Sequence, residues 1–91
     1  MLQDLKDYLK ITWDDEDAYL QNVISRGKEY LQDLTGTELD FEGEGQSKNL
    51  LLDYCRYYYN NAIEYYEESF KQELLRLQLK EAIKEVVPDE E

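Results

Sequence analysis

The sequence contains no histidine and a single cysteine, Cys55. Histidine is the side chain whose ordinary pKa lies near neutrality, so its absence removes the usual proton-transfer group. Neither a Cys–His nucleophile nor a zinc site can be assembled from these residues. One cysteine forms no internal disulfide, which fits a reducing compartment. We therefore expect Cys55 to be a small buried apolar residue, and we expect no enzymatic activity and no cofactor.

Long hydrophobic runs are also missing. No stretch approaches the roughly 20 apolar residues that a membrane span requires. The first residues, MLQDLKDYLK, lack the basic segment and apolar segment of a signal peptide. The glycines at 43–45 have no following lysine, so they do not form a phosphate-binding loop. We expect a soluble, intracellular protein with no membrane partner.

Basic residues are few, with 10 against 22 acidic ones and a net charge of -12. Lysine and arginine drive non-specific phosphate binding, so the composition disfavours a nucleic-acid clamp. An acidic protein can still work beside DNA, by repelling it or by imitating it. Two acidic clusters lack the twelve-residue calcium-loop pattern, so we expect no metal site. These clusters are Asp14, Asp15, Glu16, Asp17 and Glu38, Asp40, Glu42, Glu44.

The helical periodicity predicts an all-α fold, a small bundle of about four helices forming one domain over residues 1–91. The expected helices are 2–9, a second from the acidic residues 14–17 to Gly36, a third of about 48–68 capped by Ser47, and a fourth of about 70–87. Whether the last two are separate or continuous stays open. Residues 88–91 are expected to form a frayed acidic tail.

The second expected helix is the most clearly amphipathic. Thr12 or Asp14 is predicted to cap its start, and Gly36 to end it. Gly27 lies on the apolar face, which predicts close approach of another helix. Leu39 and Phe41 then alternate with acidic residues, so we expect an extended loop over 37–46.

Tyrosines are abundant in YCRYYYNNAIEYY, residues 54–66, which holds six of them. On one continuous helix they and their neighbours give an apolar face nearly twice the usual width of about 100°. The second helix could cover one side and another subunit the other, since tyrosine suits interfaces. Packing within the monomer is the alternative. A platform for nucleic-acid bases is disfavoured, because Arg56 is the only basic residue nearby.

The last expected helix carries two apolar rows. The first row is Phe70, Leu74 and Leu77, and the second is Leu75, Leu79, Ala82, Ile83 and Val86.

The order of motifs resembles a known family. LKDYLKI, then the acidic DDED, then LQNVISRGKEYLQDLTG is similar to the opening of the head–tail connector proteins of tailed bacteriophages and related prophages. The resemblance spans about residues 2–66. The matching positions are Tyr30, Leu31, Thr35, Gly36, Tyr57, Tyr58 and Asn60, with Asn61 where the family often has arginine. The C-terminal part is more helical than the family pattern.

The resemblance implies a structural protein without chemistry. Such proteins form a ring under the portal protein at the capsid vertex, extend the DNA tunnel and give the tail or a stopper protein its docking surface. DNA would pass without specific binding. The protein would be in the host cytoplasm during assembly and then in the virion, at the head–tail junction.

Candidate functional residues follow from these considerations. Contact between protomers is expected at Tyr57, Tyr58, Asn60 and Tyr65. The tunnel lining, or an arm reaching a neighbour, is expected at Glu38, Asp40, Glu42 and Glu44. The alternative function is a small acidic inhibitor that mimics DNA on a DNA-binding protein. Much of the acid lies at helix starts and among lysines, which favours the connector.

Overall fold

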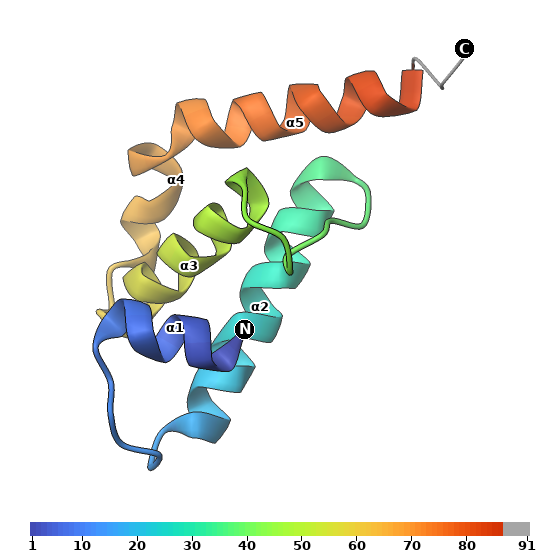
Figure 1. Cartoon of the computed structure of the whole chain (residues 1–91). Helices are drawn as coiled ribbons and strands as arrows, with labels where there is room; N and C mark the ends of the chain where they lie inside the picture. The colour runs from blue at the N-terminus through green and yellow to red at the C-terminus, as the bar shows by residue number, and fades with distance from the viewer. Residues whose placement is uncertain (87–91) are drawn as a thin grey trace.

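The computed structural model describes residues 1–86, and these residues contain helices but no strand. The elements are α1 (Leu2–Leu9), α2 (Asp17–Thr35), α3 (Gln46–Tyr59), the 3₁₀ helix η1 (Ile63–Tyr65), α4 (Tyr66–Ser69) and α5 (Lys71–Val86) (Figure 1). The predicted all-α class, with a loop between the second and third helices, is confirmed. The predicted tail over 88–91 and the predicted helix end at Val87 lie outside the described residues.

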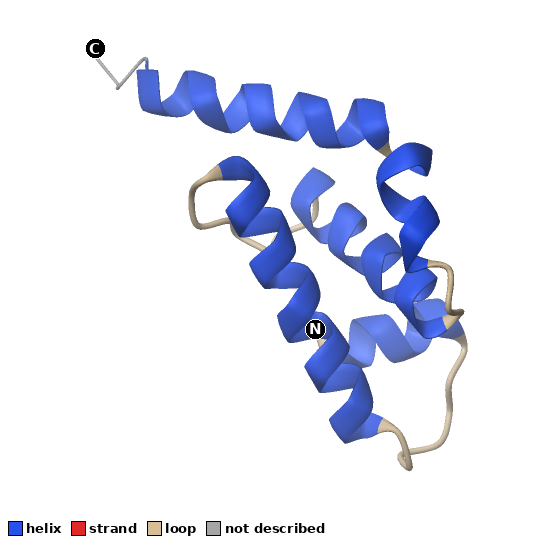
Figure 2. Cartoon of the chain, turned by 180° about the vertical axis from the view of Figure 1, so that it is seen from behind, coloured by secondary structure: helices blue, strands red, loops and turns tan. Residues whose placement is uncertain are grey.

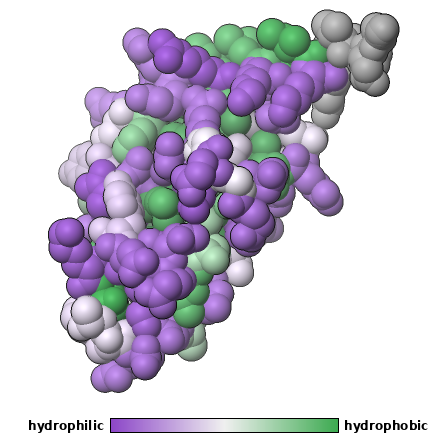
Figure 3. Space-filling model, viewed as in Figure 1, coloured by the Kyte–Doolittle hydropathy of each residue, from purple (hydrophilic) through white to green (hydrophobic). Residues whose placement is uncertain are grey.

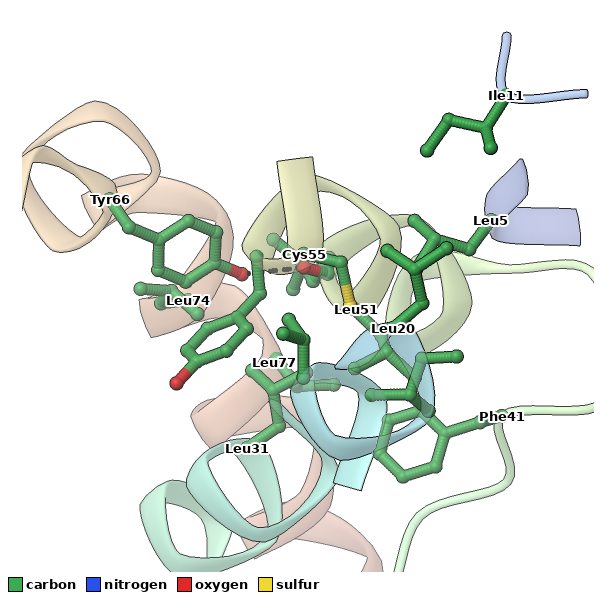
Figure 4. Packing of buried hydrophobic residues seen from close by; sticks show 14 residues of the cluster. Leu5, Ile11, Leu20, Leu31, Phe41, Leu51, Cys55, Tyr66, Leu74 and Leu77 are labelled. Carbon is green, nitrogen blue, oxygen red and sulfur yellow. Dashed lines mark hydrogen bonds between the residues drawn. The ribbon is translucent and has the colours of Figure 1, made fainter. Parts of the chain in front are cut away.

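Helices α2 and α3 lie side by side and form the centre of the fold. Helix α1 crosses them near one end, and α5 lies across the opposite end (Figures 1 and 2). The shape is elongated, 49 × 25 × 17 Å along its principal axes. Because all the helices pack on the α2–α3 pair, the core lies between them. Its fully buried side chains include Leu5, Leu20, Val23, Leu31, Leu51, Cys55, Tyr66 and Leu77 (Figure 4).

Gly27 is the point where α2 and α3 approach most tightly, as predicted. A Cβ atom built on Gly27 would lie 2.6 Å from Cδ1 of Leu51 and 2.8 Å from Cδ1 of Tyr54. Real Cβ atoms essentially never make contacts this short. Glycine is therefore required here because of the neighbouring helix, and not because of its own backbone conformation.

The predicted end of α2 is confirmed, whereas the predicted capping residues of α2 and α3 are wrong. Gly36 ends α2 in the left-handed conformation, with φ of 73°. No side chain caps α2, which begins after Glu16, because the carboxylates of Asp14 and Asp17 accept hydrogen bonds from the Lys6 ammonium at 2.6 and 2.8 Å. Helix α3 begins after Gly45, so Ser47 lies inside its first turn and does not cap it.

The expected continuous helix over 48–68 is wrong, because α3 ends at Tyr59. Asn61 adopts a left-handed backbone conformation with φ of 58°, which asparagine tolerates better than most residues. The Ala62 N–H then donates to the Tyr57 carbonyl oxygen at 2.8 Å and closes the turn. The chain changes direction here, so the tyrosines after the turn do not continue the face of α3.

Tyr66 is the largest fully buried side chain, with 1% of its surface exposed. Its hydroxyl donates a hydrogen bond of 2.7 Å to the carbonyl oxygen of Leu50, drawn as a dashed line in Figure 4. Its ring centroid lies 5.4 Å from that of Tyr54 and 5.1 Å from that of Phe70. Tyr66 therefore joins α3, α4 and the start of α5 into one core.

Cys55 is a free, buried cysteine, which confirms the sequence prediction. Burial raises the pKa of its thiol from the ordinary 9.0 to about 12. The pKa of Tyr66 is also raised, mainly by burial, and hydrogen bonds to Asp14 and Asp17 raise the pKa of Lys6. Each of these groups therefore binds its proton more tightly in the folded protein than in the unfolded chain.

Stability is therefore expected to fall at alkaline pH. A raised folded-state pKa leaves the full stabilisation in place below the unfolded pKa and removes it as pH rises towards the folded pKa. For Cys55 this window runs from 9.0 to about 12. Thermal unfolding followed by circular dichroism should show the melting temperature falling across this window. The variant Cys55→Ala should show a shallower fall from pH 9, and an identical slope would contradict this account.

Candidate functional site

The predicted interface residues divide into two pairs. Tyr57 and Tyr58 are half-buried against their own chain, with ring centroids 5.9 Å from Tyr66 and 6.1 Å from Tyr54, respectively. Asn60 and Tyr65 are exposed, and Tyr65 shows 56% of its surface. The structure thus places Tyr57 and Tyr58 in an aromatic cluster of the monomer and leaves Asn60 and Tyr65 free for other contacts.

The predicted acidic arm is fixed to its own chain. Phe41 is buried in the core, and the Leu39 N–H donates to Oε1 of Gln32 at 2.9 Å. The four predicted side chains nevertheless remain exposed to solvent: Glu38, Asp40, Glu42 and Glu44. Three of them line a hollow of about 320 Å³ that faces Lys80 and Lys84 of α5. The loop therefore presents carboxylates on a backbone that its own core contacts hold in place.

Among the described residues, α5 carries a row of uncovered apolar side chains. Its outer row consists of Leu75, Leu79, Ala82 and Ile83, and all four side chains are exposed. The exposed fraction reaches 59% at Ile83. Figure 3 shows this hydrophobic surface along the upper edge of α5. The row faces away from Leu74 and Leu77, the residues of α5 that enter the core.

The sequence separated the two rows of α5 but did not predict that the second row stays uncovered. The signal was present, because a helix with two apolar rows on opposite sides needs covering on both. The first row alone satisfies the packing that one chain of this size can offer. The second row was therefore the better indication of a partner than the tyrosines of α3.

The outer row is bordered by cations. On a helix of 100° per residue, Arg76 and Lys80 follow the row on one side, and Lys71 lies on the other. No ion pair among the described side chains involves these three residues. Residues 71–84 contain four basic and two acidic residues, whereas the whole chain has a net charge of -12. The surface of α5 is thus apolar and locally positive on a negative protein.

An aromatic groove lies between α2, α3 and α4. We call it the tyrosine groove, a hollow of about 210 Å³. Its lining is Tyr30, Tyr54, Ile63, Glu64, Tyr66 and Glu67. A second hollow of about 260 Å³ shares Tyr30 and Glu67 and continues towards α5 along Leu34, Leu74 and Leu75. Together they offer an apolar floor beside two exposed carboxylates.

Tyr30 and Glu67 connect the two sides of this groove. The Tyr30 hydroxyl donates to Oε2 of Glu67 at 2.6 Å, so α2 is linked directly to α4. Burial, together with this hydrogen bond, raises the pKa of Tyr30. Tyr30 therefore stays a neutral hydrogen-bond donor towards the Glu67 carboxyl group.

A further exposed aromatic surface lies at the turn between α1 and α2. Trp13 and Tyr19 are each exposed by nearly half. The Trp13 indole N–H and the Tyr59 hydroxyl both donate to Oε1 of Glu16, at 2.9 and 2.7 Å. These bonds, first that of Tyr59, lower the pKa of Glu16. The turn is therefore well defined, although no side chain caps the helix.

Within the part of the chain that the structure describes, no three or more acidic, histidine or cysteine side chains gather in a way that could hold a metal ion. Over the same residues, no helix combines the length and apolar character needed to cross a bilayer.

Comparison with known proteins supports the resemblance seen in the sequence. No curated protein and no solved structure shows significant similarity to this chain. The sequence does match a protein family, described as phage gp6-like head-tail connector protein, over residues 1–89. The match includes every helix of the structure and extends well beyond the motifs of residues 2–66. The chain therefore belongs to the phage gp6-like head–tail connector family.

Proposed function

We propose that this chain is the protomer of a connector ring that docks on the portal protein, extends the DNA tunnel and presents a surface to the tail or a stopper protein. Membership of a head–tail connector family supports a structural role in virion assembly, as a virion component of the head–tail junction. The ring, the portal contact and the tail contact are the parts that we add.

The observation that carries this proposal is the outer row of α5. A monomer of this size leaves Leu75, Leu79 and Ile83 more than half exposed on one face of a helix. A contiguous exposed apolar surface of this kind marks a protein interface more often than a free surface. Because the fold is only 17 Å thick along its shortest axis, its core is thin and neighbouring subunits would complete it.

The acidic surface suits a DNA tunnel. The exposed carboxylates of the 37–45 loop would repel phosphates over about 8–10 Å at physiological ionic strength, so that DNA slides past. The DNA-mimic alternative requires a continuous row of unpaired carboxylates. Here Lys6 forms ion pairs with Asp14 and Asp17, and Lys48 forms ion pairs with Asp4 and Glu44. These internal pairs favour the connector.

Electron microscopy with the portal protein of the same phage tests the proposal. We expect the purified chain to add a ring of density coaxial with the portal and to leave the tunnel open. A ring is expected because contacts between unlike surfaces close into cyclic assemblies when the rotation permits it. Portals that remain bare at saturating concentrations of the chain would contradict the proposed function.

A further inference from the structure

We propose that the outer row of α5 of one copy docks in the tyrosine groove of a neighbouring copy. This inference rests on the proposed function, because it names the contact between ring protomers. It assigns unlike surfaces to the two sides of the interface: a helix face on one copy and a groove between three helices on the other.

Shape and polarity support this pairing. Leu79 and Ile83 are four residues apart, which places them about 6 Å apart on one side of the helix. An amphipathic helix that binds a groove uses residues at this spacing as its anchors. The two adjoining hollows, about 210 and 260 Å³, can each take one aliphatic side chain of this row.

Charge supports it as well. Arg76 and Lys80 lie beside the outer row, and the groove carries Glu64 and Glu67. The tyrosine groove is lined by these two glutamates and by no lysine or arginine, whereas Lys71 lines the adjoining second hollow. In the proposed contact, the cations beside the outer row of α5 would thus lie close to the carboxylates of the tyrosine groove. Such complementarity chiefly selects the partner and the register of the contact.

The occupant of the groove is then a second copy and not the same chain. Leu75 lines the second hollow of its own chain, but Leu79 and Ile83 line neither hollow and stay exposed, so these two side chains are free to enter the groove of another copy. Pairing α5 with α5 of another copy would bring Arg76 and Lys80 of both copies together. Residues 1–70 contain sixteen acidic and six basic residues, so the rest of a second copy attracts α5.

Charge reversal with sedimentation equilibrium tests the contact. We expect the wild-type chain to self-associate, and Ile83→Asp to weaken this association at least tenfold. Arg76→Glu and Glu64→Lys should each weaken it, and the double variant should restore it. Ser25→Asp, on the exposed face of α2, is the matched control and should change nothing. Circular dichroism should show the same helix content for every variant, since each altered side chain is exposed.

Three results would overturn the inference. One is a wild-type chain that stays monomeric up to about 1 mM, which corresponds to a contact weaker than about 4 kcal/mol. Another is loss of association with Ile83→Asp while Glu64→Lys has no effect, which would indicate pairing of α5 with α5 or with another protein. The third is a double variant that associates no more strongly than either single variant. A ring on the portal that tolerates Ile83→Asp would overturn this contact alone, whereas bare portals would count against the proposed function alone.

Discussion

Tyr66→Ala is expected to lower the free energy of unfolding by about 3–5 kcal/mol, the range for truncating a buried aromatic residue. Tyr66 is 1% exposed and packs against Tyr54, Tyr57 and Phe70. Truncation would leave a cavity where α3, α4 and α5 meet, and it would remove the hydrogen bond to the Leu50 carbonyl. Because small domains are stable by only about 5–15 kcal/mol, this is a large fraction of the total. Urea unfolding followed by circular dichroism measures it.

The neighbouring residue supplies the control. Tyr65 is 56% exposed, so Tyr65→Ala should change the free energy of unfolding by no more than about 0.5 kcal/mol. Tyr66→Phe keeps the ring and removes only the hydroxyl, so it should cost about 0.5–1.5 kcal/mol. A larger loss for Tyr65→Ala than for Tyr66→Ala would contradict this structure and favour the continuous helix expected from the sequence.

The difference between these two tyrosines explains where sequence reasoning failed. On an unbroken helix, Tyr65 falls on the apolar face of α3 and Tyr66 at its edge. The turn at Asn60–Asn61 interrupts the helix, and the chain after it points in a new direction. As a result Tyr66 is buried and Tyr65 is exposed. Asparagine is compatible with a helix, so periodicity alone did not detect the break. What drives the turn is the burial of Tyr66, which depends on contacts between residues distant in the sequence.

The predicted capping residues of α2 were wrong for a similar reason. The acidic residues at 14–17 form a reasonable capping pattern, and local propensity has no information about Lys6 on α1. In the fold, that ammonium lies between Asp14 and Asp17 and engages both carboxylates. The end of α2 was easier to predict, because Gly36 acts through its own backbone conformation and needs no distant partner.

The candidate site was predictable only in part. The exposure of the acidic side chains in the 37–45 loop was predictable from their charge. Helix α5 was predicted together with both of its apolar rows. The groove was not predictable, because Tyr30, Ile63 and Glu67 come from three elements that only the fold brings together. The order of motifs indicated the family, but family membership does not show which surfaces contact one another.

Gly27→Val is expected to lower the free energy of unfolding by about 1–3 kcal/mol through overpacking. Replacing a helical glycine normally stabilises a helix by up to about 1 kcal/mol, so the contact with α3 must outweigh a favourable term. It does so because the new Cβ would lie within 3 Å of Leu51 and Tyr54, which are 0% and 8% exposed and would have to leave their packed positions. The added atoms would therefore force α2 and α3 apart.

A double-mutant cycle isolates this effect from helix propensity. Ser25→Val, on the exposed face of the same helix, adds a β-branched side chain without a neighbour and should cost no more than about 0.5 kcal/mol. Leu51→Ala removes the atom 2.6 Å from the new Cβ, so the double variant with Gly27→Val should be more stable than the sum of the two single losses. Strict additivity would mean that the helices do not touch at Gly27. The tyrosine groove is built from α2, α3 and α4, so a separation of α2 from α3 that propagates to Tyr30 would also weaken self-association.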